Sequence, residues 1–364
     1  MIKFIVLNSL LMLMVACAGQ EKSAVQIKMG LTEDFVFGDT VTSLDSNIMI
    51  VFQDKMYNFW FGSWTNGLYR FDGKTLLHFT TKHGLPHDRI DEIKEDHMGN
   101  VFINTSNGLC RFDGKRLVVI TETLSSGYGW QLQDHDLWFK PSYEGDGEVL
   151  RYDGIQLQRL KLPRTSIGEA RVAEYPTAPS PYIIYTSYKD SHGNIWFGTA
   201  ALGVCRFDGV KFDWIQEEDV TELHTGPSNG VRSIIEDADG YFWFNSAYKY
   251  DIYGRKSHEA IQSKENSFYQ RIKSIGNLDG QADSDFYEYL SIAKDDNNEL
   301  WIATYNDGVW KQRGNGFIQY PVLIGGKQIH IFSIYKDHHG NLWIGTHENG
   351  AFKFDGNSFN PFMP

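Results

Sequence analysis

The chain has 364 residues and carries 46 acidic against 34 basic side chains, which gives a formal net charge of -12 at pH 7. This acidic balance argues against a nucleic-acid partner, because binding to a phosphate backbone normally requires a basic surface. Aromatic residues make up 15% of the sequence and 35 glycines are spread along it, a combination that favours strands and tight turns over helices. We therefore expect an all-β protein.

The chain begins with one lysine followed by an apolar run at 4–15. The run is too short to span a bilayer as a permanent helix and ends in small residues, which is the pattern of a secretion signal. The sequence MVAC at 14–17 resembles the lipobox of bacterial lipoproteins, whose cysteine becomes the lipid-carrying first residue. On that resemblance we expect 1–16 to be a signal peptide, Cys17 the lipidation site and 17–33 a tether. An ordinary cleaved signal with an incidental cysteine is the alternative.

Further along the chain one phrase recurs, written most clearly as KDHHGNLWIGTHENGAFKFDG at 336–356. Aligning the copies on the aromatic residue of LWIGT gives seven sites, spaced 36 to 58 residues apart. This is the period of a four-stranded propeller blade and not of a helical solenoid. Each copy divides into four strands, and the aromatic residue lies on the second. The seven sites are Trp60, Phe102, Trp138, Trp196, Trp243, Trp301 and Trp343.

The polar part of the phrase predicts turns. An Asp-x-x-Gly sequence separates the first two strands and Asp-Gly separates the last two; the aspartate can accept backbone N–H bonds, and the glycine can adopt positive φ. Carboxylates placed one per blade around a rim cannot converge on one ion, so we expect them to be structural and expect no metal site. The aspartates of the Asp-Gly turns are Asp72, Asp113, Asp153, Asp208 and Asp355.

The repeat predicts that residues 34–364 form a seven-bladed β-propeller of four-stranded antiparallel blades. Each strand-two aromatic should face the next blade, because one sheet cannot cover both of its faces while seven around an axis can. Cys110 and Cys205 occupy equivalent positions in non-neighbouring copies, so we expect two buried free thiols.

The repeat pattern is less clear at the two ends of the chain and in the copies that depart from the common phrase. Residues 34–38 and the C-terminal NSFNPF both resemble a fourth strand, and we assign the C-terminal one to the last blade. The third copy has no turn glycine, and the fifth, SAYKYDIYGRK, is expected to lose its regular third strand. Two connections, 163–181 and 255–285, are long, and such insertions often carry binding surfaces.

The phrase D-x-x-G-N-L-W-I-G-T followed by G-x-x-(R/K)-F-D-G resembles the two-component regulator propeller repeat. The copies at 95–114, 190–209 and 337–356 match it best, and the resemblance extends over about 46–364. That family is known from extracytoplasmic sensors of hybrid sensor kinases in Bacteroidetes. The resemblance implies the propeller fold and extracytoplasmic sensing of glycan-like ligands. No kinase segment is recognisable, so we do not expect the chain to signal alone.

The loops that join second to third strands should surround one mouth of the central channel. Aromatic rings with amide and carboxylate neighbours suit a sugar, because its C–H faces stack while its hydroxyls form directional hydrogen bonds. The alternative is that each of these aromatic residues only packs against the rim of its own blade and binds no ligand. The predicted ligand-binding residues are Trp64, Tyr143, Tyr248, Tyr305, His347, Asn66, Asn306, Asp307 and Glu348.

Catalytic signatures are not found in the sequence: there is no G-x-S-x-G, H-E-x-x-H or Walker motif. We expect a non-catalytic binding or sensing protein without a cofactor, lipid-anchored at the cell envelope on the periplasmic side or the outer surface. Its expected partners are a glycan or small molecule and an envelope protein such as a separate sensor kinase. A protein-interaction scaffold is the first alternative, and a propeller lyase or hydrolase is the second.

Overall fold

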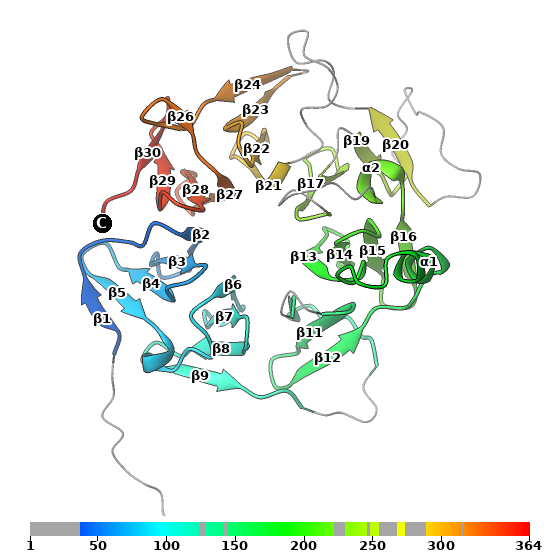
Figure 1. Ribbon diagram of the computed structural model, residues 1–364, viewed down its shortest axis with the longest axis horizontal. Coiled ribbons are helices and arrows are strands. Elements are labelled where there is room, and N and C mark those ends of the chain that lie inside the picture. The colour runs from blue at the N-terminus through cyan, green and yellow to red at the C-terminus, as the bar shows by residue number, and fades with distance from the viewer. Residues whose placement is uncertain are drawn as a thin grey trace, which may run out of the picture. The chain divides into compact units, whose positions relative to one another are not determined.

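The computed structural model describes residues 37–123, 129–141, 145–221, 230–245, 248–254, 268–273, 289–314 and 316–364. One compact unit spans Val36–Pro364. Its sheets stand around a central axis in seven blades, with the first strand of a regular blade nearest the axis and the fourth strand outermost (Figure 1). The predicted seven-bladed all-β propeller is thereby confirmed.

Blades 2, 4 and 5 are four-stranded antiparallel sheets in which strand order follows the chain. Blade 2 consists of β6 (Ile90–Glu95), β7 (Val101–Thr105), β8 (Gly108–Phe112) and β9 (Leu117–Ile120). Blade 4 consists of β13 (Ile184–Lys189), β14 (Ile195–Thr199), β15 (Val204–Phe207) and β16 (Phe212–Ile215). Blade 5 consists of β17 (Ile234–Glu236), β18 (Phe242–Phe244), β19 (Tyr248–Asp251) and β20 (Gln270–Lys273).

Blades 6 and 7 follow the same plan, with a small hairpin between them. Blade 6 consists of β21 (Tyr289–Lys294), β22 (Leu300–Thr304), β23 (Val309–Arg313) and β24 (Gly316–Tyr320). The hairpin is β25 (Leu323–Ile324) and β26 (Lys327–Gln328). Blade 7 consists of β27 (Ile331–Lys336), β28 (Leu342–Thr346), β29 (Ala351–Phe354) and β30 (Phe359–Pro361).

Blade 1 has five strands, because a short N-terminal strand joins its outer edge. It consists of β1 (Asp39–Val41), β2 (Ile48–Gln53), β3 (Phe59–Ser63), β4 (Leu68–Phe71) and β5 (Leu76–Phe79), and the 3-10 turn η1 (Thr81–His83) follows. β1 pairs with β5, while the C-terminal β30 pairs with β29. The assignment of the C-terminal strand to blade 7 is therefore confirmed, and the N-terminal segment supplies a fifth strand.

The ring closes between blades 7 and 1 without a shared sheet. The Phe59 and Trp343 rings lie 4.6 Å apart, the Gly350 N–H donates to the Ser46 carbonyl at 2.6 Å, and the Tyr335 hydroxyl donates to the Gln53 carbonyl at 3.3 Å. Closure thus depends on side-chain packing and a few hydrogen bonds between the two ends of the chain.

Blade 3 departs from the four-stranded expectation. The described part of it has three strands, β10 (Leu137–Phe139), β11 (Glu148–Tyr152) and β12 (Leu157–Lys161). Its inner edge is capped by side chains of the flanking blades, because Lys94 and Ser187 both donate to the Trp138 carbonyl. At the outer edge, Glu122 forms a parallel bridge with Leu157. Residues 122 and 123 therefore lie along the outer edge of this sheet.

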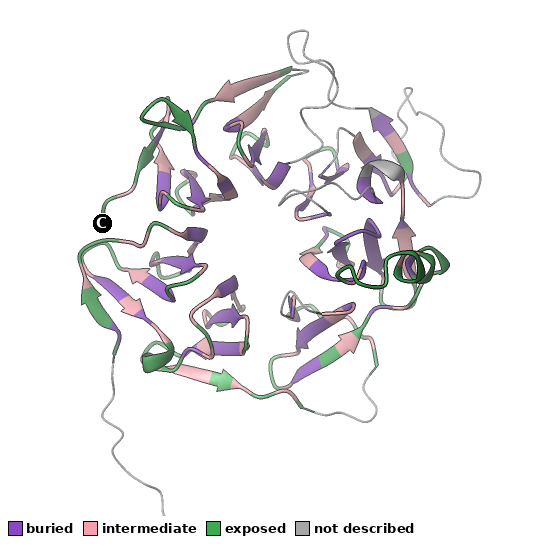
Figure 2. Ribbon diagram, in the orientation of Figure 1, coloured by how far each residue is buried: buried purple, intermediate pink, exposed green. Residues whose placement is uncertain are grey.

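The repeated Asp and Trp are joined by a hydrogen bond. In five blades the indole Nε1 of the strand-two tryptophan donates at 2.8–2.9 Å to an aspartate six residues earlier in the first turn. Each of the seven strand-two aromatics is buried and faces the next blade, as Trp196 does against Phe242 at 4.8 Å between ring centres. The predicted interblade layer is confirmed, and Figure 2 shows the buried residues concentrated on the sheets.

The glycine of LWIGT provides room for the next blade. A Cβ on Gly198 would lie 2.2 Å from the Val231 carbonyl oxygen of blade 5, and one on Gly345 would lie 2.7 Å from the Met49 carbonyl oxygen of blade 1. Blade 5 has asparagine at this place, and the Asn245 side-chain amide donates to the Tyr289 carbonyl of blade 6. In these three blades, the residue two after the strand-two aromatic lies against the backbone of the next blade, either as a glycine or as an asparagine that bonds it.

One strand prediction was wrong. The fifth copy keeps its third strand, β19, which pairs with both β18 and β20 although its sequence departs from the phrase. The connection at 163–181 contains the helix α1 (Ser166–Glu174), and α2 (Glu218–Thr221) follows blade 4. Most of the connection at 255–285 lies outside the described residues.

The two cysteines match the expectation. Cys110 and Cys205 are buried and free, and burial raises the pKa of the Cys110 thiol to about 12. Such thiols are protonated at neutral pH and are part of the core. Neither α-helix in the described part of the chain is long and apolar enough to cross a membrane.

Candidate functional site

Each blade contributes loops to two opposite rims of the ring. We call the rim with the loops from second to third strands, and the connections between blades, the loop face. The other rim, with the two kinds of aspartate turn, is the turn face. The predicted ligand-binding residues belong to segments at or next to the loop face.

The structure brings two of these residues together between blades 6 and 7. The Tyr305 ring stacks on His330 with 4.4 Å between centres and 4° between planes, and Phe332 lies 5.6 Å from the rings of both Tyr305 and His347. All four side chains are half-buried. We call Tyr305, His330, Phe332 and His347 the loop-face cluster.

Polar groups border this cluster. The Glu348 carboxylate, which is exposed, lies 3.6 Å from His347 Nδ1, and Asn306 is exposed beside Tyr305. The Asp307 carboxylate accepts a 2.9 Å hydrogen bond from the Gln319 side chain. Aromatic faces and hydrogen-bonding groups thus lie together at this part of the rim.

A second aromatic position lies between blades 1 and 2. The Arg89 guanidinium lies 3.5 Å from the centre of the Trp64 ring, and its Nε donates to Asp91 at 3.0 Å. The neighbouring Asn66 side chain donates to the Tyr69 hydroxyl. The indole therefore already has a cation on one face, and its surroundings are more charged than those of the loop-face cluster.

One predicted residue, Tyr248, lies in neither group. Tyr248 opens strand β19 and is half-buried against two hydrophobic clusters, with the Arg271 guanidinium 4.5 Å from its ring centre. This is the packing of a residue between blades. Tyr143 lies outside the described residues, as does the expected lipidation site Cys17.

Sequence reasoning missed the contribution of the first strands. His330 and Phe332 lie at the start of β27, and Tyr185 and Arg232, whose guanidinium lies 4.0 Å above the tyrosine ring, occupy comparable places in blades 4 and 5. The sequence did contain a signal for these residues, because Phe332, Tyr185 and Arg232 share one position, five residues before the turn aspartate of their blade. In blades 4 and 7 a β-bulge falls at this point, which redirects side chains at a strand end.

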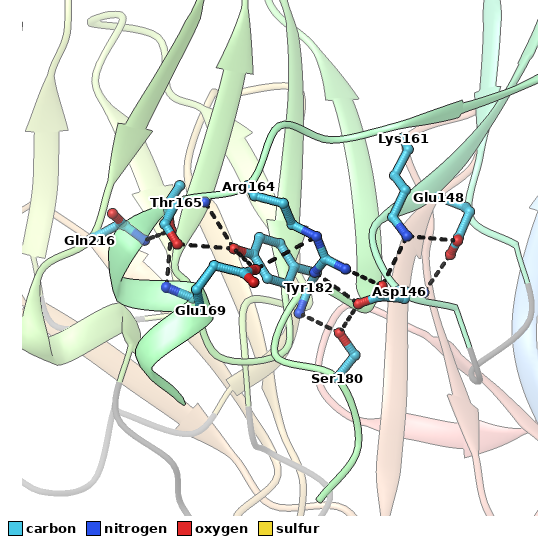
Figure 3. Close-up of polar contacts among 10 residues, drawn as sticks. Asp146, Glu148, Lys161, Arg164, Thr165, Glu169, Ser180, Tyr182 and Gln216 are labelled. Carbon is cyan, nitrogen blue, oxygen red and sulfur yellow. Dashed lines mark hydrogen bonds and ion pairs between the residues drawn. The ribbon is translucent and has the colours of Figure 1, made fainter. Parts of the chain in front are cut away.

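The connection at 163–181 is held to the loop face by a polar network (Figure 3). The Asp146 carboxylate accepts hydrogen bonds from Ser180, Lys161 and Arg164. Burial alone would raise the pKa of Asp146, but these three donors outweigh it and lower the pKa to about 2. The carboxylate is therefore ionised at physiological pH and anchors both ends of the insertion.

The helix α1 is fixed by a buried tyrosine. The Tyr182 hydroxyl accepts the Thr165 N–H at 2.8 Å and donates to Glu169, and the Arg164 guanidinium lies 4.3 Å above its ring (Figure 3). Thr165 caps the helix by accepting the Gly168 N–H. A Cβ on Gly168 would lie 2.1 Å from the Tyr182 hydroxyl, so glycine is required where the helix meets the tyrosine.

The turn face repeats one arrangement and has the structural role that the sequence predicted. The aspartates of the five Asp-Gly turns each accept two backbone N–H bonds, for example Asp72 from Lys74 and Thr75. These bonds lower the pKa of Asp72. Within the described ranges, no group of three or more His, Cys, Asp or Glu side chains is placed to hold a metal ion.

A ring of radial antiparallel sheets with a largely repeated turn face and a varied loop face defines a seven-bladed β-propeller. Three segments, 179–201, 225–248 and 325–348, match the model of the family described as two component regulator propeller. Segments that match the repeat of this family are therefore present in the chain, and the predicted resemblance is confirmed. No curated protein sequence matches the chain significantly.

Solved propellers share the fold at low sequence identity. The extracellular domain of BT4673 from B. thetaiotaomicron, described as a one component system and elsewhere as a hybrid two component system, is 18% identical with a TM-score of 0.55. The match covers 86% of this chain and 40% of that domain, so this chain spans about two fifths of its length. Virginiamycin B lyase from Staphylococcus aureus is 14% identical with a TM-score of 0.58, and coverage is 86% and 97%.

Proposed function

We propose that this protein is a non-catalytic, extracytoplasmic sensing module that binds a glycan or another small hydroxylated ligand at its loop face. The loop-face cluster carries the proposal, because it gathers two aromatic rings and two imidazoles at one rim beside exposed amide and carboxylate groups. Such a surface stacks on the C–H face of a sugar and bonds its hydroxyls. The similarity to extracellular sensor domains supports the extracytoplasmic setting.

The direct test is binding to a glycan array, followed by calorimetry, with Tyr305→Ala. Loss of the tyrosine removes the ring that stacks on His330, so affinity should fall at least tenfold while the melting temperature stays within about 2 °C. Tyr57→Ala is the matched control, because Tyr57 is an exposed tyrosine that packs on histidines of the turn face. Equal loss of binding in both variants would contradict the proposal.

The proposed location is the cell envelope, with Cys17 as the lipid anchor. Cys17→Ser should move the protein from the membrane fraction to the soluble fraction and abolish incorporation of labelled palmitate. Retention of the label in the variant would show that another residue carries the lipid.

A protein-interaction scaffold is the second candidate, and the fixed connection at 163–181 favours it. The network around Asp146 and Tyr182 holds α1 in one place while Ile167 and Tyr175 remain about half exposed. A rigidly presented surface of this kind suits an envelope protein such as a separate sensor kinase. If it is the functional surface, Ile167→Glu with Tyr175→Glu should abolish cross-linking to that kinase, whereas Tyr305→Ala should not.

Catalysis is the outcome that would overturn the non-catalytic proposal. The structural similarity to virginiamycin B lyase makes this an experiment to perform. Turnover of a bound ligand that EDTA suppresses would identify the protein as a metal-assisted enzyme instead.

A further inference from the structure

The turn face carries an open groove between blades 6 and 7, with a volume of about 820 Å³. Trp301 and Phe354 provide aromatic surface, and the C-terminal residues 360–363 form one side. The charged side chains that line it are Asp295, Asp296, Lys311, Lys353 and Asp355. This groove lies on the rim opposite the loop-face cluster, so what it binds is independent of the proposed function.

Between blades 4 and 5 the corresponding space is filled by the protein itself. Tyr253 lies just after β19 and stacks on His192 with 3.8 Å between ring centres. Its hydroxyl donates to Asp190 at 2.6 Å and accepts from the Asn194 side chain at 2.6 Å. Burial and this bond to Asp190 raise the pKa of Tyr253, so the phenol stays protonated and donates.

Most contacts of Tyr253 have equivalents in the groove. The exception is Asn194, which donates to the Tyr253 hydroxyl and corresponds to Glu299, a carboxylate that pairs with Lys311 at 2.8 Å. Counting from the turn aspartates and the strand-two tryptophans, four of its neighbours correspond to groove residues. The pairs are Asp190 with Asp295, His192 with Asn297, Arg206 with Lys311, and Phe242 with Leu342.

The residue at the position of Tyr253 differs between the two sites. The N–H of Tyr253 donates to Asp251, and the N–H of Asn357 donates in the same way to Asp355. Asn357 is exposed and does not line the groove. The position that corresponds to Tyr253 therefore contributes no side chain to the groove between blades 6 and 7.

Of the two lysines that line the groove, only Lys311 has a carboxylate partner among the described residues. Asp295 accepts from the Trp301 indole and pairs with Lys311 at 3.2 Å, and Asp296 pairs with Lys336 at 2.6 Å. Lys353 lies 5.3 Å from the Trp343 ring centre, and within the described part of the chain no carboxylate lies within 4 Å of its ammonium. An anionic ligand group would supply that partner.

We propose that the groove binds a hydroxylated aromatic acid. The ligand ring takes the place that Tyr253 takes between blades 4 and 5, its hydroxyl donates to Asp295, and its carboxylate pairs with Lys353. The chemical class is that of 4-hydroxyphenyl carboxylates. The site is distinct from the glycan site proposed on the loop face.

The test is calorimetric titration of the full chain with 4-hydroxyphenylacetate. One equivalent should bind, and Lys353→Gln should weaken it at least tenfold. Lys115→Gln, an exposed lysine on the turn face of blade 2, is the matched control and should bind as the wild type does. Phenylacetate, which has no hydroxyl, should bind at least fivefold more weakly. Absence of binding at millimolar concentration, or equal affinity of the two lysine variants, would overturn the proposal.

A second variant fills the groove without touching the core. Asn360 is exposed and lines the groove, so Asn360→Trp should block the titration while leaving the melting temperature within about 2 °C. Tyr305→Ala on the opposite rim should leave the titration unchanged. Undiminished binding in a folded Asn360→Trp variant would place the ligand elsewhere and overturn the proposal.

Discussion

The two rims of this propeller use their residues differently. On the turn face the same interactions recur from blade to blade, with the indole of Trp60, Trp196 or Trp343 donating to an aspartate six residues earlier. On the loop face Tyr305 stacks on a histidine, whereas Trp64 lies under an arginine. The repeated residues maintain the blades, and the residues that differ between blades are available for recognition.

Blade 3 sharpens this comparison, because it keeps its place in the ring without the hydrogen bond between aspartate and tryptophan that most blades have. Asp136, two residues before Trp138, bonds the guanidinium of Arg151 at 2.8 Å, and both side chains are almost fully buried. Its inner edge is closed by Lys94 and Ser187. A blade can thus leave the common pattern when neighbouring side chains replace the missing hydrogen bonds.

The largest expected effect comes from removing a strand-two tryptophan. Trp196→Ala should lower the free energy of unfolding by about 3–5 kcal/mol in urea denaturation, because it opens a cavity between blades 4 and 5. Trp196→Phe keeps one aromatic ring but loses the bond to Asp190 and part of the packing, so it should cost less, about 1–3 kcal/mol. Equal costs for the two variants would mean that packing of this ring is unimportant.

A smaller effect is expected at the glycine of the second strand. Gly198→Ala places a methyl group 2.2 Å from the Val231 carbonyl oxygen, which must move, so unfolding should become easier by about 1–3 kcal/mol. Gly129→Ala is the matched control, because a Cβ there meets no atom within 4 Å. An equal urea midpoint for both variants would contradict close contact between blades 4 and 5.

The smallest effect is a dependence on pH. Burial would raise the pKa of Asp337, but the Trp343 indole and Asn341 outweigh it, so the folded-state pKa lies below the unfolded value of 3.8. The resulting stabilisation is present above about pH 4 and is lost as pH falls through the lower folded value. The urea midpoint should therefore fall between pH 5 and pH 3, and less steeply in Asp337→Asn. An identical slope in the variant would show that this carboxylate does not contribute.

Much of the fold could be predicted because the signal is local and repeated. In most copies the strand-two aromatic, its turn aspartate and a glycine lie within a few residues of one another, so a single copy specifies a blade. The place of the C-terminal strand was also predictable, since NSFNPF can pair with β29 as a hairpin. The strand β19 was missed because its ladder forms from backbone groups that a changed sequence still supplies.

The rest could not be predicted because it depends on residues far apart in the chain. Lys94 and Ser187 meet at Trp138 only after blades 2 and 4 have formed. His330 and Phe332 were not predicted, because the predicted site residues came from the loops after the second strands. The first strands begin at the same rim, so residues at their start also lie there. The binding roles of Trp64, Tyr143, Tyr248 and the other predicted loop residues stay predictions.

The division between the rims is tested most directly by two substitutions four residues apart in blade 7. Trp343→Ala and His347→Ala, compared in urea denaturation, separate an interblade tryptophan from a residue of the loop-face cluster. We expect Trp343→Ala to lose about 3–5 kcal/mol and His347→Ala to stay within about 0.5 kcal/mol of the wild type. A loss for His347→Ala as large as that for Trp343→Ala would contradict the account.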